Sequence, residues 1–162
     1  MPSLMAALLV AGNALACASE PAKAPHAERP LDEAIARQLI AEAVRSEGAT
    51  PTGGRLISLP RDKHLLADIG VSGHKLAIAF VTASERQTLG ASVPAYDVGS
   101  TALQLVRDAN DHDARILILH DLSYVTDEQT GDEREVSSVA VSNRLQRDVR
   151  DFLAEAKKQG WP

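Results

Sequence analysis

Residues 75–81 read KLAIAFV, an apolar run in which large and small side chains alternate. Alternate residues of a strand point to opposite faces of a sheet. One face therefore carries the bulky side chains and the other the small ones, in the order Leu76, Ile78, Phe80 and Ala77, Ala79, Val81. The small face leaves room for a helix to approach closely. The pattern predicts a central strand.

A second apolar run, ILIL at residues 116–119, has no polar face and predicts an interior strand that is covered on both sides. Thr82 and Glu85 have the spacing of a capping box, which predicts a short helix ending near Leu89. The remaining strands are expected at 53–60, 64–71, 102–107 and 134–141. Apolar residues at helical spacing predict a helix over 31–47 and another from a Ser142 cap to near Gly160.

These elements predict one α+β domain over residues 31–162. We expect a mainly antiparallel sheet of about five strands, covered by an N-terminal and a C-terminal helix. The core must be mostly aliphatic, because only 3% of the residues are aromatic.

Residues 1–19 contain no acidic or basic side chain, and an apolar run starting at Leu4 leads into a small-residue segment that ends at Cys17. A run of this length is too short to cross a bilayer but suits a secretory signal. Residues 1–17 resemble the bacterial lipoprotein signal class, in which a Leu-Ala/Ser-Gly/Ala-Cys pattern precedes cleavage and the cysteine receives lipid. Ala16 and Cys17 match this pattern, whereas Ala14 and Leu15 depart from it.

The resemblance implies a membrane anchor through lipid on Cys17, the only cysteine of the chain. Cleavage of the Ala-x-Ala type near the same point would instead release a soluble secreted protein. A third interpretation makes residues 1–16 an apolar helix of the domain. Residues 18–30, ASEPAKAPHAERP, are rich in proline, alanine and charge and are expected to form an extended tether.

His120 and Asp121 follow the predicted interior strand, at a position where general bases are often presented. Together with Asp68 they are the catalytic candidates, and they would suit a small envelope hydrolase. Alternation places His120 on the same face as Ile116 and Ile118, which favours a half-buried structural histidine. The sequence contains no nucleophile elbow and no glycine-rich nucleotide loop, so no cofactor is expected.

A polar turn after the 102–107 strand carries oxygen ligands of the type that calcium prefers. Its candidate ligands are Asp108, Asn110, Asp111 and Asp113. They do not follow the calcium-loop pattern, because His112 occupies a ligand position. A solvated turn is favoured, and weak calcium binding by an adhesion module is the alternative.

The formal net charge of −5 opposes binding to nucleic acid. In the last helix, Arg144 with Asp148 and Arg147 with Asp151 have the spacing of ion pairs. We therefore expect an exported, lipid-anchored cell-envelope protein with a non-enzymatic binding or accessory role. The membrane, through Cys17, and an envelope protein are its expected partners, and the periplasm or its membrane surface is its expected location.

Overall fold

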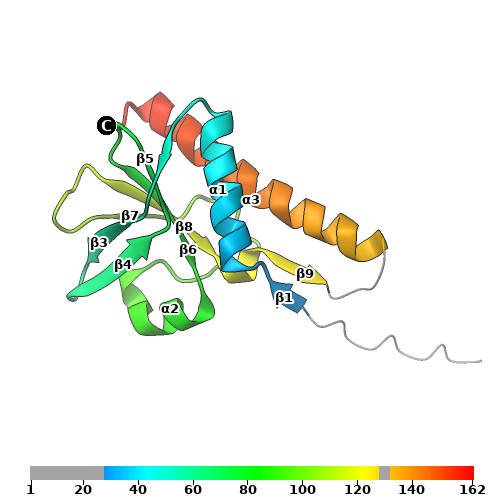
Figure 1. The fold of residues 1–162 in the computed structure, drawn as a ribbon. Helices are drawn as coiled ribbons and strands as arrows, with labels where there is room; N and C mark the ends of the chain where they lie inside the picture. The colour runs from blue at the N-terminus through cyan, green and yellow to red at the C-terminus, as the bar shows by residue number, and fades with distance from the viewer. Residues whose placement is uncertain (1–27, 128–131) are drawn as a thin grey trace, which may run out of the picture.

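The structure, a computed structural model, describes residues 28–127 and 132–162. Its helices are α1 (Glu33–Ser46), α2 (Ala83–Leu89) and α3 (Asp132–Gln159), with short 3-10 turns η1 (Gly90–Ser92) and η2 (Asp121–Ser123). Its strands are β1 (Glu28–Pro30), β2 (Pro51–Thr52), β3 (Arg55–Leu59), β4 (Lys63–Ala67), β5 (Ile69–Val71), β6 (Leu76–Val81), β7 (Leu105–Arg107), β8 (Arg115–His120) and β9 (Val125–Asp127). They form the expected α+β domain (Figure 1).

The main sheet has five strands in the order β2-β5-β6-β8-β7. Its two longest strands, β6 and β8, lie side by side in the centre and run parallel, with Ala77 opposite Ile116 and Val81 opposite His120. The neighbouring pairs β2–β5, β5–β6 and β7–β8 are antiparallel. The prediction of a mainly antiparallel sheet with a central strand over residues 75–81 is confirmed.

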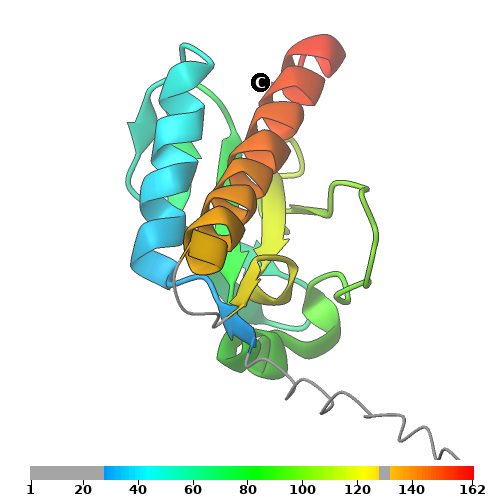
Figure 2. The ribbon, with the colours of Figure 1, turned by 90° about the vertical axis from the view of Figure 1, so that its right-hand side faces the viewer.

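Both long helices cover the same face of this sheet (Figure 2). The core on that side joins Phe80 and Leu117 of the sheet to Ile40 of α1 and to Val149 and Phe152 of α3. The expectation that a helix would approach the small face is wrong for α1 and α3, because the bulky side chains fill the wide space beneath them. The β3–β4 hairpin and Leu89 of α2 cover the face of Ala77 and Ala79 instead.

The strand predicted over 134–141 does not exist, because α3 already begins at Asp132. Valine has a high strand propensity, but tertiary packing overrides propensity. Val141 continues the helical stripe of Leu145 and Val149 and packs against the core. Ser142 is therefore not a helix cap; its hydroxyl donates to the Ser138 carbonyl oxygen at 2.9 Å, within the helix.

The predicted strand over 64–71 is divided into β4 and β5 at Asp68. The first part pairs with β3 in the covering hairpin, whereas the second joins the main sheet beside β6. The chain thus passes from one layer to the other at this residue. The capping box is confirmed: the Thr82 hydroxyl accepts from the Glu85 amide and the Glu85 carboxylate accepts from the Thr82 amide.

The expected tether ends earlier than predicted, because residues 28–30 form β1 and pair with β9. Strands are usually rich in β-branched and aromatic residues. The sequence ERP contains none, so it gives no indication of this strand. The rest of the tether and the whole signal segment, with Cys17, lie outside the described residues. Within residues 28–127 and 132–162, no helix is both long and apolar enough to cross a membrane.

Candidate functional site

The carboxyl end of β8 carries the two residues that sequence reasoning singled out first. His120 is the last residue of β8 and Asp121 begins η2; their exposed fractions are 3% and 5%. Within the described part of the chain, neither ring nitrogen of His120 makes a hydrogen bond of ordinary geometry, although the Pro94 carbonyl is close enough to raise the pKa of the ring. The histidine is therefore buried more deeply than predicted and is not oriented by the neighbouring carboxylate.

The Asp121 carboxylate binds to two groups of the short helix α2. One oxygen accepts from the Ala83 amide at 2.9 Å, and the other forms an ion pair with the Arg86 guanidinium. Arg86 also donates to the Val81 carbonyl oxygen at 3.1 Å. We name these groups, Val81, Ala83, Arg86 and Asp121, the α2 anchor. They fix the short helix to the ends of β6 and β8.

Asp68 is likewise engaged in structural contacts. One carboxylate oxygen accepts from the Phe80 amide at 2.7 Å, and the other receives the Arg37 guanidinium at 3.1 Å. The pKa of Arg37 is raised, first by its hydrogen bond to Asp68 and then by the charge of that carboxylate. Asp68 therefore supports the break between β4 and β5 and does not converge with His120.

The calcium candidates lie in the turn between β7 and β8. The Asp108 carboxylate accepts from the Asn110 amide at 2.8 Å, and the Asn110 side chain donates to the Ser58 hydroxyl at 2.8 Å. The Lys75 ammonium lies 3.0 Å from the Asp111 carboxylate and 3.4 Å from that of Asp113. Its hydrogen bond is the main cause that lowers the pKa of Asp111.

The Lys75 ammonium therefore occupies the space between the carboxylates of Asp111 and Asp113. In residues 28–127 and 132–162, no group of three or more histidine, cysteine, aspartate or glutamate side chains is arranged to hold a metal ion.

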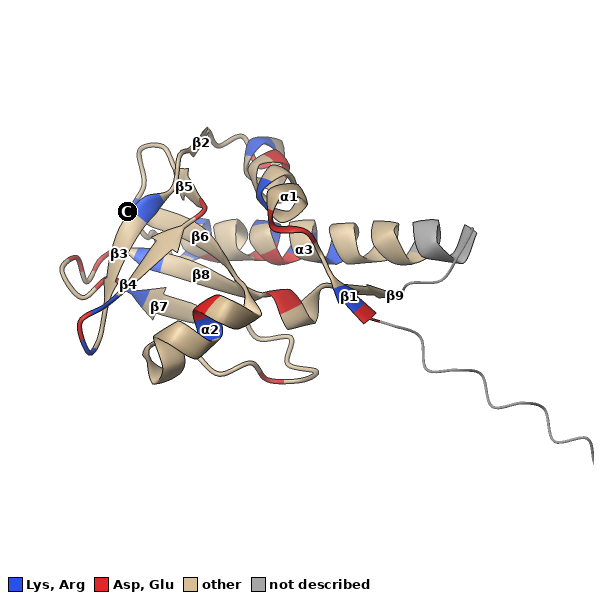
Figure 3. Cartoon of the chain, turned by 60° about the horizontal axis from the view of Figure 1, so that its bottom comes forward, with Lys and Arg blue, Asp and Glu red and all other residues tan. Residues whose placement is uncertain are grey.

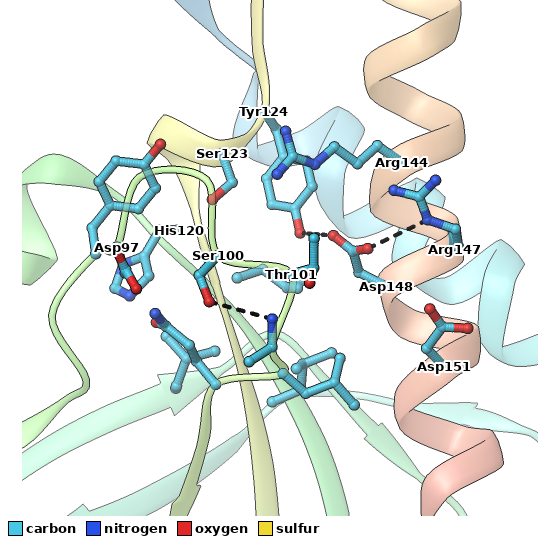
Figure 4. Close-up of a pocket in the computed structure, with 17 residues that line it drawn as sticks. Asp97, Ser100, Thr101, His120, Ser123, Tyr124, Arg144, Arg147, Asp148 and Asp151 are labelled. Carbon is cyan, nitrogen blue, oxygen red and sulfur yellow. Dashed lines mark hydrogen bonds and ion pairs between the residues drawn. The ribbon is translucent and has the colours of Figure 1, made fainter.

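His120 also lines a pocket of about 290 Å³, whose lining does not include the residues of the α2 anchor. Its walls are the segment 96–104, the end of β8 and the middle of α3. In Figure 4, Arg144, Arg147, Asp148 and Asp151 lie along α3 on one side, while Asp97 and His120 lie on the opposite side. We call this space the α3 pocket. Its lining contains side chains of both charge signs, and both signs also alternate along the coloured part of α3 (Figure 3).

The closed side of the α3 pocket contains buried polar atoms without partners. The Tyr96 ring contacts His120 edge-on, with ring centroids 5.9 Å apart. Burial lowers the pKa of His120, and the Arg86 guanidinium adds to this effect, which the Pro94 carbonyl and the Asp121 carboxylate oppose. The imidazole is consequently neutral at pH 7, with one nitrogen able to donate and the other able to accept.

Gln104 provides a second such group in the lining of the pocket. Its side-chain nitrogen donates to the Ala95 carbonyl oxygen at 3.1 Å, which fixes the amide. Its side-chain oxygen is buried and has no hydrogen-bond partner in the described part of the chain. A buried polar atom without a partner costs about 1–3 kcal/mol. Both residues line the α3 pocket, but these polar atoms have almost no accessible surface, so a bound polar molecule would satisfy them only after a local shift of the lining.

The α3 wall is organised by Tyr124. Its hydroxyl donates to the Asp148 carboxylate at 2.7 Å, and burial followed by the Asp148 charge raises the pKa of this tyrosine. Arg147 reaches the same carboxylate at 3.8 Å. The Arg144 guanidinium lies 6.0 Å from the centroid of the Tyr124 ring. Among the described residues, Arg144 has no carboxylate within ion-pair distance; it is exposed and lines the α3 pocket at the side that we call its mouth.

Sequence reasoning found His120 but missed the rest of the α3 pocket. The expected pairs of Arg144 with Asp148 and of Arg147 with Asp151 do not form, because Tyr124 and Arg147 engage Asp148. The signal that could have found the site was the cluster of arginines in the last helix. Its other walls come from segments whose proximity no local pattern indicates.

Comparisons of this chain with family models, with curated proteins and with solved structures find no match. The candidate site is therefore assigned from its own geometry.

Proposed function

We propose that this protein is an exported, lipid-anchored component of the cell envelope with a non-enzymatic binding role, and that the α3 pocket is its ligand site. The observation that carries the binding role is the pair of partnerless buried groups, His120 and Gln104, in the lining of that pocket. Folded proteins pair nearly all buried polar atoms, so exceptions in a concave site favour an absent ligand.

The arrangement of the acidic candidates supports binding over hydrolysis. The carboxylates of Asp121 and Asp68 are held by backbone amides and by arginines. A general base needs a group to orient it and a substrate or water within reach. The contacts of His120 provide no such orientation, while the fixed Gln104 amide suits recognition.

The lipid anchor is proposed from residues 1–17 and the resemblance they carry. Metabolic labelling with palmitate in a bacterial host, followed by membrane fractionation, tests it. We expect label on the full chain and none on the Cys17→Ser variant. An unlabelled chain with an intact N-terminus, found in the cytoplasmic fraction, would contradict export and anchoring.

Binding can be tested with a panel of small polar compounds. Saturation-transfer NMR of the full chain with mixtures of monosaccharides, sugar acids and amino acids should detect at least one bound compound. Thr101→Trp fills the α3 pocket and should abolish the signal, whereas Thr88→Trp on α2 should preserve it. The compound should remain chemically unchanged. Binding that survives Thr101→Trp would remove the pocket from the proposal, and turnover would replace binding by catalysis.

A further inference from the structure

The side of the α3 pocket that carries His120 and Gln104, its closed side, favours a ligand that both donates and accepts hydrogen bonds, as hydroxyl groups do. A neutral imidazole offers one donor and one acceptor, and the Gln104 oxygen offers an acceptor only. A hydroxyl group can both donate and accept, so it satisfies either residue. An apolar ligand would leave both His120 and Gln104 unpaired, at a penalty that disfavours it.

The mouth of the pocket favours one negative charge. The Tyr124 hydroxyl holds Asp148, which leaves the Arg144 guanidinium without a carboxylate partner among the residues described. A guanidinium binds a carboxylate through two parallel hydrogen bonds, which are stronger than neutral ones.

The other acidic side chains of the pocket disfavour a ligand with more than one negative charge. Asp97 and Asp151 also line the pocket, on opposite sides (Figure 4). Their carboxylates can accept from ligand hydroxyls, but they repel a second anionic group. Multiply charged phosphates and dicarboxylates are therefore disfavoured relative to a single carboxylate.

The size of the pocket sets the last condition. Its volume of about 290 Å³ lies at the lower end of the range of small-molecule sites. The half-buried Tyr96 ring adds an apolar surface to the lining. A single ring with an apolar face and several hydroxyls fits these limits better than an extended chain.

We propose that the α3 pocket binds a sugar acid, that is, a monosaccharide with one carboxylate, which Arg144 holds at the mouth while His120 and Gln104 hold its hydroxyls. This proposal rests on the α3 pocket being a ligand site, and it names the chemical class of the ligand. No covalent step is involved.

Isothermal titration of the full chain with three probes tests the assignment. Sodium glucuronate has both features, glucose lacks the carboxylate, and cyclohexanecarboxylate lacks the hydroxyls. We expect glucuronate to bind at least about tenfold more tightly than either of the others, since a charge-assisted pair provides that much discrimination. Equal affinity of glucuronate and glucose would overturn the proposal.

Two variants separate the recognition elements. Arg144→Gln should weaken glucuronate about tenfold and leave glucose unchanged, whereas Arg150→Gln, on α3 but outside the pocket lining, should change neither. His120→Phe should weaken both sugars and leave cyclohexanecarboxylate unchanged. If glucuronate does not bind but another compound does so in a Thr101→Trp-sensitive way, the sugar-acid assignment fails and the binding site stands. If no compound binds in the pocket, both fail.

Discussion

Two regions meet at the carboxyl end of β8 and treat adjacent polar residues in opposite ways. In the α2 anchor, the buried Asp121 carboxylate is matched by an amide and a guanidinium. In the α3 pocket, the equally buried His120 makes no hydrogen bond of ordinary geometry with the described residues, and the Gln104 oxygen has no partner among them. We therefore assign a structural role to Asp121, whose hydrogen bonds are made within the fold, and a binding role to His120, whose ring nitrogens are left for a ligand.

The comparison also explains why the two neighbouring catalytic candidates do not act together. His120 and Asp121 follow one another, but successive residues at a strand end point to different sides. The carboxylate therefore turns to α2 and the imidazole to the segment 96–104. The two side chains are neighbours in the sequence but do not belong to the same site.

The largest expected effect comes from breaking the α2 anchor. Asp121→Ala leaves the partly buried Arg86 guanidinium without its counterion and the Ala83 amide without an acceptor. We expect the free energy of unfolding to fall by about 3 kcal/mol, as measured by urea denaturation. Asp113→Ala removes an exposed carboxylate and should change stability by less than about 0.5 kcal/mol. Equal effects of the two substitutions would contradict the structural role of Asp121.

Asp68 should give the second largest effect. Asp68→Ala removes the acceptor of the buried Phe80 amide, and we expect a loss of about 2 kcal/mol in the same measurement. Arg37→Gln removes only the exposed ionic partner and should cost less than about 1 kcal/mol. A larger cost for Arg37→Gln would shift the role of Asp68 from the backbone amide to the ion pair.

Much of the fold was predictable because its central elements have strong local patterns. The alternation over 75–81 and the apolar run over 116–119 correctly predicted β6 and β8. The start of α3 was missed because valines at 136, 139 and 141 suit a strand as well as a helix. Only packing against α1 and the sheet decides between them.

The candidate site was much less predictable. His120 was identified by its place at a strand end, but its surroundings depend on the Tyr96 ring, which comes from another segment. The availability of Arg144 depends on Tyr124 engaging Asp148, across two distant segments. Spacing along one helix suggested the opposite pairing. Such competition between partners is visible only in three dimensions.

A smaller effect is expected when the unpaired imidazole is removed. His120→Phe keeps a buried aromatic ring and deletes both partnerless nitrogens, so stability at pH 7.5 should change by less than about 1 kcal/mol. A loss as large as that of Asp121→Ala would show that the imidazole is structural, and the comparison would fail.

The same residue predicts a pH dependence. The folded-state pKa of His120 is lowered, so below the ordinary value of 6.5 the unfolded chain binds a proton that the folded chain does not. Unfolding free energy should therefore fall as the pH drops from about 7.5 to 5.5, and His120→Phe should reduce this fall. An identical pH profile for both chains would argue that the folded protein accepts the proton freely.

The smallest effect on stability belongs to Arg144. Its guanidinium is exposed and has no ion pair with any described carboxylate, so Arg144→Gln should leave the free energy of unfolding within about 0.5 kcal/mol of the parent. Thermal denaturation at several salt concentrations checks this. A marked destabilisation would assign the arginine to the fold and leave the pocket mouth without its cation.

The most direct measurement is NMR of the His120 ring nitrogens in the full chain during titration with sodium glucuronate. We predict that the ring-nitrogen shifts of His120 move with saturation, while those of the exposed His74 and the amide of Ala83 in the α2 anchor stay in place. His120 resonances that remain unchanged while glucuronate binds would contradict the claim that this buried imidazole forms hydrogen bonds with the ligand of the α3 pocket.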